Sequence, residues 1–262
     1  SFGGLGLVNT PSARFYDEGS LSLSYYDGYP DKKLSLAIYP YDWMEAIVFY
    51  SSFENLEYGG GFYEQDRKDK GFNIKFRIKE EDNWPAIALG FNDLGGTGYY
   101  SSEYIVSSYS IGNFDLNFGI GWGHLNGHDH FRNPFTLISD NFNDRINDLD
   151  LGGKFNLKSL FSGKKASFFG GINYVYSDKV FFNLEYDTIS DNEKIRYKSK
   201  ESDYSFGINF QPNSKLTFGL NYERGSNISL NISSRRNLLN DHTKFKSLKI
   251  KSKNRYENLR RI

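Results

Sequence analysis

The fold is decided by WPAIALGFNDLGGTGYYSSEYIVSSYSIGNFDLNFGIGWGHL, residues 84–125, and most clearly by its last part. Over Phe114–Gly123 (FDLNFGIGWG), bulky apolar residues alternate with Asp, Asn and Gly. A period of two with one apolar face is the signature of a β-strand. The apolar face here is continuous and aromatic, and the opposite face holds nothing that could build a core. We therefore interpret the stretch as the wall of a transmembrane β-barrel. Alternation alone leaves a soluble β-sandwich open as the alternative.

The composition of the chain also points away from an ordinary soluble enzyme. Aromatic residues make up 18% of the 262 residues, with 20 Tyr and 23 Phe. Mean hydropathy is −0.60, and no run of about eighteen apolar residues occurs, so the sequence predicts no transmembrane helix. High aromatic content with low hydropathy is typical of barrels, in which only alternate residues meet lipid. Equal counts of basic and acidic residues (32 each) give no net-charge argument for a nucleic-acid partner, and the absence of Cys excludes a disulfide framework and thiolate chemistry.

The lengths of the connections favour the membrane barrel over the sandwich. Bacterial barrels have short periplasmic turns and longer extracellular loops. If the first strand starts near Ser20, every short turn falls on one side, provided that the strand-like residues 148–157 belong to a long outer excursion. The sequence thus predicts an all-β, antiparallel up-and-down barrel of roughly twelve strands. The short turns are 40–43, 81–84, 112–113, 177–179 and 212–215, and the long connections are 54–69, 124–164 and 189–203.

The same pattern divides the chain into three parts. Residues 1–18 are Gly-rich and alternate too briefly for a wall strand, so we expect a periplasmic segment or a plug. Residues 19–235 form the expected barrel, in which 125–164 is a long outer loop that could fold into the lumen, because loops of this length usually have structure or function of their own. Residues 236–262 are a basic tail or linker.

Alternation also predicts which polar side chains face the lumen. Charged and amide groups inside a barrel can bind a hydroxyl-rich ligand, or they can form a salt-bridged interior that plugs the barrel. The sequence leaves both interpretations open. The candidates for the lumen or a ligand site are Asn73, Lys75, Arg77, Asn92, Asp115, Asn117, Asn183, Glu185, Asp187, Asn209, Asn221 and Glu223.

The sequence contains no strong signal for catalysis or a metal. His124, His128 and His130 are weak metal candidates, because their loop lacks the helical spacing that presents two imidazoles together. Asp140–Asp150 is rich in the oxygen ligands that Ca²⁺ prefers, but lacks the Gly and the terminal Glu of an EF-hand loop. Neither a Gly-x-Ser-x-Gly elbow nor an HExxH helix is present. We expect no catalytic residues, no metal and no cofactor.

Several segments resemble one known family. FGGLGLVNTPSARF, the 84–125 stretch with its DLGGTG and SSEY elements, FFGGINYVY, FNLEYD and FGLNYERGSNISLNISSR occur in order between Phe2 and Arg235. They resemble the YjbH/GfcD family of outer-membrane exopolysaccharide and capsule proteins. The resemblance implies an outer-membrane β-barrel encoded with polysaccharide secretion genes, with no established catalytic residues to carry over. Family members are much longer, so the chain resembles their first part.

The expected function is exopolysaccharide or capsule secretion or surface presentation by a non-catalytic barrel. The alternatives are a general porin or solute channel and, third, a barrel-wall hydrolase acting on lipid or polysaccharide. We expect the chain in the cell outer membrane of a Gram-negative bacterium, with its signal peptide removed. The expected partners are outer-membrane lipid, polysaccharide, and either other components of an export complex or further segments of a longer family protein, with no nucleic acid.

Overall fold

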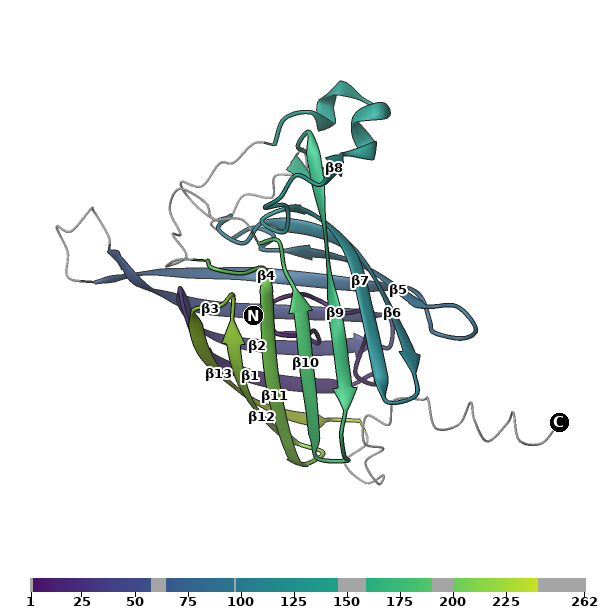
Figure 1. Cartoon of the computed structure of the whole chain (residues 1–262), viewed down its shortest axis with the longest axis vertical. Helices are drawn as coiled ribbons and strands as arrows, with labels where there is room; N and C mark the ends of the chain where they lie inside the picture. The colour runs from purple at the N-terminus through teal and green to yellow at the C-terminus, as the bar shows by residue number, and fades with distance from the viewer. Residues whose placement is uncertain (1, 58–64, 97, 146–158, 190–199, 240–262) are drawn as a thin grey trace.

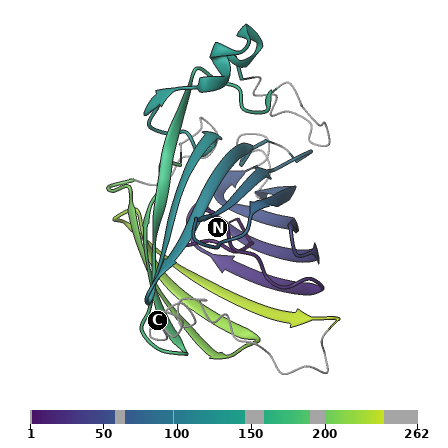
Figure 2. The same cartoon turned by 90° about the vertical axis from the view of Figure 1, so that its right-hand side faces the viewer.

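Twelve antiparallel strands close into a β-barrel in the computed structural model, which describes residues 2–57, 65–96, 98–145, 159–189 and 200–239 (Figures 1 and 2). The ring closes because β1 pairs with β13, and β9 pairs with both β7 and β10. The predicted all-β barrel of roughly twelve strands is confirmed. Its strands are β1 (Ser20–Asp27), β2 (Asp31–Tyr41), β3 (Met44–Glu57), β4 (Asp66–Lys79), β5 (Ala86–Asn92), β6 (Ser102–Ile111), β7 (Phe114–Gly123), β9 (Lys165–Val175), β10 (Val180–Tyr186), β11 (Tyr204–Asn213), β12 (Leu216–Glu223) and β13 (Asn227–Asn237). A two-residue strand, β8 (Phe131–Arg132), pairs with β9 beyond the ring.

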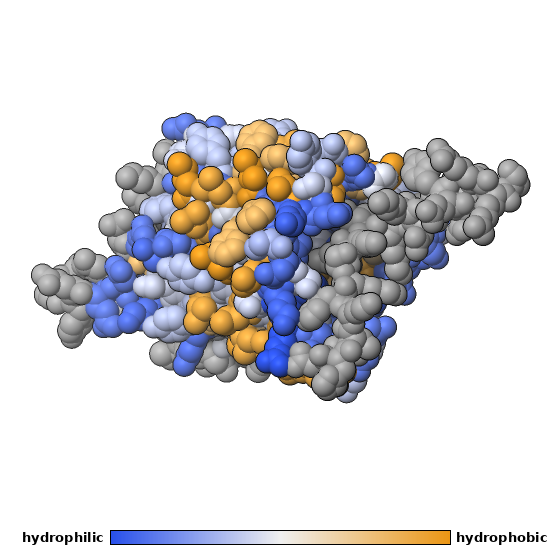
Figure 3. Space-filling view, turned by 90° about the horizontal axis from the view of Figure 1, so that it is seen from below, coloured by the Kyte–Doolittle hydropathy of each residue, from blue (hydrophilic) through white to orange (hydrophobic). Residues whose placement is uncertain are grey.

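The two faces of each strand differ as the alternation requires. On β7, the outward side chains of Phe114 and Phe118 are 47% and 55% exposed, whereas the inward Asp115 and Asn117 are each 5% exposed. Figure 3 shows apolar side chains gathered in a band across the middle of one face, with hydrophilic side chains on either side of it. An apolar band of this kind on a barrel wall is what a hydrocarbon layer requires.

Aromatic side chains border the wall near both ends of the strands. Tyr41 and Trp43 stack at 5.2 Å beside the turn between β2 and β3. Rings at the two edges of an apolar band match the aromatic girdles of membrane barrels. The exposed members are Tyr41, Trp43, Trp84, Phe114 and Tyr176 toward the short turns, and Tyr25, Tyr50, Tyr204 and Tyr222 toward the opposite end.

The connections separate by length between the two ends of the barrel. One end carries the turns 42–43, 80–85, 112–113, 176–179 and 214–215. The opposite end carries the long connections 58–65, 93–101, 124–164 and 187–203, together with two short ones at 28–30 and 224–226. The two ends are called the short-turn end and the long-loop end below.

The described part of the excursion 124–164 packs mainly on the outside of the wall. Trp122 points outward from β7, yet it is 2% exposed because the rings of Phe135 and Phe161 lie 5.7 and 5.1 Å from it. Arg145 donates to the outward carboxylate of Glu103 on β6, at 2.7 and 2.9 Å. The excursion includes two short 3-10 helices, η2 (Pro134–Leu137) and η3 (Asp140–Phe142), and rises above the end of β9 in Figure 1. The strand-like residues 148–157 lie outside the described residues.

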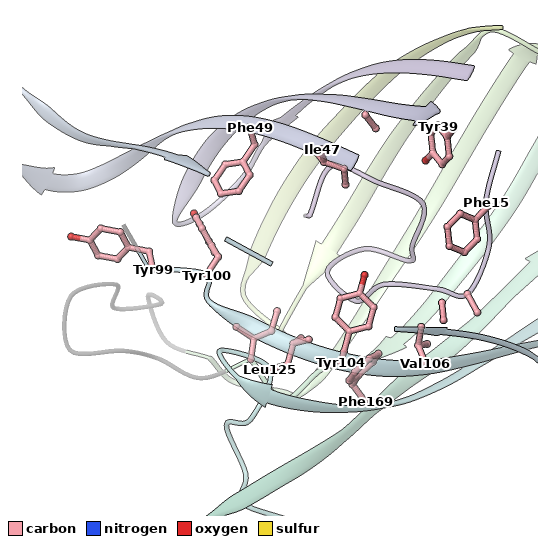
Figure 4. Close-up of a cluster of buried hydrophobic side chains, with 14 of the residues drawn as sticks. Phe15, Tyr39, Ile47, Phe49, Tyr99, Tyr100, Tyr104, Val106, Leu125 and Phe169 are labelled. Carbon is pink, nitrogen blue, oxygen red and sulfur yellow. The ribbon is translucent and has the colours of Figure 1, made fainter. Parts of the chain in front are cut away.

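The interior of the barrel contains an apolar core on one side. Tyr39, Ile47 and Phe49 from β2 and β3 face Tyr104 and Phe169 from β6 and β9 (Figure 4). Ala13 and Phe15, which precede the first strand, belong to the same cluster. No helix among the described residues is long and apolar enough to cross a membrane.

Candidate functional site in the barrel lumen

Residues 2–18 are called the N-terminal segment; residues 2–16 lie inside the barrel, and the exposed Asp17 and Glu18 lead into β1 (Figure 2). The segment folds back on itself, with a bridge between Gly6 and Pro11 and a hydrogen bond from the Leu7 amide to the Thr10 carbonyl at 2.9 Å. Wall side chains hold it along its length. Asn73 of β4 donates to the Phe2 carbonyl at 3.0 Å, and the Ala13 amide donates to Ser108 of β6 at 2.8 Å.

The turn of this segment is gripped by a buried carboxylate. Glu185 of β10 accepts hydrogen bonds from the amides of Val8, Asn9 and Thr10 at 2.8–3.0 Å, and from the Thr10 hydroxyl at 2.8 Å. The side-chain Nδ2 of Asn9 donates to the carboxylate of Glu223 on β12 at 2.7 Å. Backbone N–H groups that converge on a carboxylate form charge-assisted bonds, about twice as strong as neutral ones. The segment therefore supplies the donors that the two buried wall carboxylates need.

A buried ion pair holds the segment from the other side of the lumen. Lys75 of β4 lies 3.1 Å from Glu45 of β3, and its ammonium also donates to the carbonyls of Ser12 and Arg14 at 3.1 and 2.9 Å. Glu45 in turn accepts from the Leu5 amide at 3.3 Å. A buried charge pair is tolerated only when further hydrogen bonds satisfy both ions, and here the segment backbone provides them.

Arg14 fastens the segment near the short-turn end. Its guanidinium binds the carboxylates of Asp115 on β7 and of Glu81 in the turn before β5, and donates to Ser110 of β6 at 2.8 Å. Because a guanidinium presents its donors in a rigid fork, this contact fixes the segment against three separate parts of the wall.

The DLGGTG sequence folds the connection between β5 and β6 into the mouth of the lumen at the long-loop end. Asp93 has a φ of 56° and accepts from the Tyr100 amide at 3.0 Å. A Cβ on Gly96 would lie 1.7 Å from Asp93 Oδ1, so only glycine fits there. The loop thereby buries Tyr99 and Tyr100, and the Tyr100 hydroxyl donates to Asp31 at 2.7 Å while Lys33 lies 3.6 Å from its ring centroid.

Two titratable groups at this mouth have shifted pKa values. Burial raises the pKa of the Asp93 carboxyl to about 7, and the nearby charge of Asp69 adds to the shift. Burial lowers the pKa of His124 to about 3, helped by the charges of Arg224 and Lys33. His124 packs edge-on against Tyr100, with ring centroids 5.6 Å apart. His124 is thus a neutral side chain that helps to close the mouth.

The structure brings two of the three candidate metal-ligating histidines together and separates the third. His128 and His130 stack outside the lumen with ring centroids 5.6 Å apart, and His128 also contacts Asp203 at 2.9 Å. His124 is buried within the lumen. Within the described ranges, no group of three His, Cys, Asp or Glu side chains could hold a metal ion. The Asp-rich stretch 140–150 falls partly outside the described residues.

All twelve lumen candidates point toward the interior, and the segment contacts several of them. Eleven are buried, whereas Arg77 is half-buried near the ring of Phe15. Sequence reasoning missed the inward Asp31, Lys33 and Glu45, although β2 and β3 show the same alternation of burial. It also missed Glu81 and Arg14, which no period of two could indicate, since they lie in a turn and in the N-terminal segment.

Small cavities lie beside the segment in the described part of the lumen. Two cavities of about 20 Å³ each lie between it and the wall, one beside Glu45 and Lys75 and the other beside Tyr26, Lys33 and His124. A volume of this size holds about one water molecule, so neither cavity admits a sugar ring. At these two places the N-terminal segment leaves space for water but not for a sugar.

Known proteins similar to this chain include a long lipoprotein and several outer-membrane barrels. The Uncharacterized lipoprotein YjbH of Escherichia coli (strain K12) is 33% identical over 242 residues, which are 90% of this chain and 34% of that protein. The chain thus spans about a third of its relative's length. Among solved structures, the NanC porin (TM-score 0.41, 12% identity, 83% of this chain and 98% of that chain) and the KdgM porin (0.42, 9%, 82% and 97%) are similar only at a distance that carries no argument about function.

The comparison with protein families matches nearly the whole chain. The model of the YjbH family, described as "Exopolysaccharide biosynthesis protein YbjH", matches residues 1–260. That match covers the barrel and the N-terminal segment that fills it. The chain therefore belongs to the YjbH exopolysaccharide biosynthesis family.

Proposed function

We propose that this chain is an outer-membrane barrel that takes part in the secretion or surface presentation of an exopolysaccharide, without catalysis. The observation that carries the proposal is the family match over residues 1–260. The apolar outer band and the aromatic borders support a place in the membrane. The partners proposed with it are outer-membrane lipid, the polysaccharide, and either an export complex or the rest of a longer protein.

The N-terminal segment inside the lumen favours this proposal over a general porin. A porin that passes solutes freely needs a water-filled channel through the barrel. Here the N-terminal segment is held by Glu185, by the pair of Glu45 and Lys75, and by Asp115. A lumen that holds such a segment fits a barrel through which molecules pass only when the segment moves.

The proposal is tested in the cell that carries the gene. A strain lacking the gene is compared with the same strain complemented by the intact gene, and secreted polymer is measured in both. We expect polymer at the surface or in the medium to fall in the deletion strain and to return on complementation. Unchanged polymer would overturn the proposal, and so would a wide open pore with little solute preference in single-channel recordings of the purified protein.

A further inference from the structure

One side of the lumen wall, on β9–β13, carries an unusual set of amides. Inward asparagines recur on neighbouring strands: Asn173 pairs directly with Asn183, and Gly207 lies between Asn183 and Asn221 in the register. In the next row, Gly219 lies between Asn209 and Asn231. We call this set the asparagine strip: Asn173, Asn183, Asn209, Asn221 and Asn231, with the intervening Gly207 and Gly219. It crosses five strands, or roughly 19 Å at the usual strand spacing.

Several amides of the strip make no hydrogen bond within the described part of the chain. The free atoms are Oδ1 of Asn173, Asn183 and Asn231, and Nδ2 of Asn209. Asn183 and Asn209 are each only 6% exposed. Buried polar groups are normally paired, because an unpaired buried group has lost its hydrogen bonds to water without replacement. The strip therefore presents to the lumen both hydrogen-bond donors and hydrogen-bond acceptors that a ligand could use.

The glycines give the strip a flat floor between its amides. A Cβ at Gly207 would lie 2.5 Å from Oδ1 of Asn221, and one at Gly219 would lie 2.7 Å from Oδ1 of Asn209. The same Cβ at Gly207 would lie 3.5 Å from Val8 of the N-terminal segment. The segment thus rests directly over the part of the strip that is nearest to Glu185.

The charges around the strip restrict what it can bind. Strands β10, β11 and β12 contain no Lys or Arg, and their buried charges are the carboxylates of Glu185 and Glu223. Arg224, which directly follows β12, is buried and paired with Asp187 at 3.2 Å, and Arg235 of β13 lies over the ring of Tyr16. All hydrogen bonds to Glu185 within the described residues come from Val8, Asn9 and Thr10. A ligand here must offer donors to carboxylates and both donors and acceptors to amides, and an anionic ligand would be repelled.

We infer that Glu185, Glu223 and the asparagine strip form a binding site for a neutral, hydroxyl-rich saccharide. Residues 8–10 of the N-terminal segment occupy the carboxylate end of this site as an internal ligand. Adjacent hydroxyls of a sugar ring donate to a carboxylate as the Thr10 hydroxyl and its neighbouring amides do. The inference rests on the proposed function, since it names the class of polymer that the lumen accepts and excludes acidic sugars.

The first experiment displaces the segment and records single-channel currents of the full chain in lipid bilayers. The double variant Asn9→Asp/Arg14→Glu places a further carboxylate beside Glu223 and another beside Asp115 and Glu81, which repels the segment at two points. We expect its conductance to rise. A neutral maltooligosaccharide should then block the current, whereas a uronic-acid oligosaccharide of equal length should not.

Wall variants in the same background locate the block. Asn183→Ala/Asn209→Ala should abolish the block by the neutral sugar and keep the conductance. The matched control is Ser51→Ala, which removes a buried inward hydroxyl from β3, outside the strip. The inference is overturned if the conductance of the double variant stays at the wild-type level, or if neutral and acidic sugars block its current equally. It is also overturned if the neutral sugar blocks the asparagine variant as strongly as it blocks the Ser51→Ala control.

A second measurement needs no displaced segment and covers the case in which the double variant does not fold. The chain has no cysteine, so Ser12→Cys introduces a single thiol at a position that is 2% exposed. In the folded barrel, an excess of neutral oligosaccharide should raise the rate of labelling by a water-soluble maleimide at least about threefold, because the sugar competes with the segment. An equal rate with and without the sugar overturns the inference. The polymer assay of the deletion strain tests the proposed function separately.

Discussion

Replacing Glu185 by glutamine should loosen the N-terminal segment without disturbing the barrel wall. The side chain keeps its size and its place on β10, but it loses the charge that attracts three amides and a hydroxyl. The glutamine oxygen can still accept one or two of these bonds, while its NH₂ group faces donors. Hydrogen bonds to a charged group contribute about 1.5–3 kcal/mol each and are not additive, so a net loss of roughly 2–4 kcal/mol follows. At 1.4 kcal/mol per tenfold, the fraction of barrels with the segment displaced should rise roughly 30- to 700-fold.

The rate at which a maleimide labels Ser12→Cys reports this fraction, because position 12 is 2% exposed and its thiol reacts only when residues 8–12 move away from the wall. Labelling is followed in barrels folded into lipid vesicles, with and without Glu185→Gln. Thr10→Val is the matched control, since it removes a single hydroxyl bond to the same carboxylate. It should accelerate labelling by about tenfold, which corresponds to about 1.5 kcal/mol, the lower end for one bond to a charged group. If Glu185→Gln labels no faster than Thr10→Val, the carboxylate does not hold the segment and the reasoning fails.

Three further predictions concern buried titratable groups. Lys75→Met leaves Glu45 buried without its cation and should lower the free energy of unfolding in urea by about 3–5 kcal/mol. Lys75→Met/Glu45→Gln should recover most of that loss, and an equal loss in both variants would contradict the pairing. The pKa of Asp93 is raised from 3.8 to about 7, so between these pH values the folded state binds a proton that the unfolded state has already released. The free energy of unfolding therefore falls as the pH rises from about 4 to 7. Asp93→Asn, which tolerates the positive φ, should therefore gain stability over the wild type as the pH rises from 4 to 7 and keep a constant advantage above 7; an advantage that does not vary with pH would refute the shift. His124, with its pKa lowered to about 3, should show no change in its ring NMR shifts between pH 5 and 8, and a titration midpoint near 6.5 would show that it is exposed.

The wall of the barrel was predictable because each strand carries its own signal. Phe114–Gly123 alternates strictly, and an inward Asp115 beside an outward Phe114 needs no information from elsewhere in the chain. Trp122 shows the limit of that reasoning. Its position on the outer face follows from the period, but its burial depends on Phe135 and Phe161, which come from a loop without periodicity.

The contacts inside the lumen could not be predicted in the same way. The bond from Thr10 to Glu185 joins residues that are 175 positions apart, and nothing local in either stretch indicates the other. The period placed Glu185 inside the barrel, and the Gly-rich composition marked residues 1–18 as different from the wall. Which wall residues the segment touches depends on barrel closure and strand register. The DLGGTG loop is a similar case, because its glycines are explained only by the fold of Asp93 over Gly96 at the lumen mouth.

The chemistry of the two sides of the lumen explains how one short segment can be both held and released. Toward β2–β7, Ala13 and Phe15 of the segment join an apolar core, in which burial is non-directional and costly to undo. Toward β10–β12, Val8, Asn9 and Thr10 meet carboxylates and amides, which water or hydroxyl groups can satisfy equally well. Exchange of the polar contacts for those of a sugar costs little, whereas withdrawal of Phe15 from the core costs about 1.5–3 kcal/mol for a buried apolar side chain. Residues 8–10 should therefore leave the wall first, while Phe15 stays in place. Phe15→Ala should then convert a local opening at Glu185 into release of the whole segment, seen as labelling of Ser12→Cys that no longer depends on added sugar.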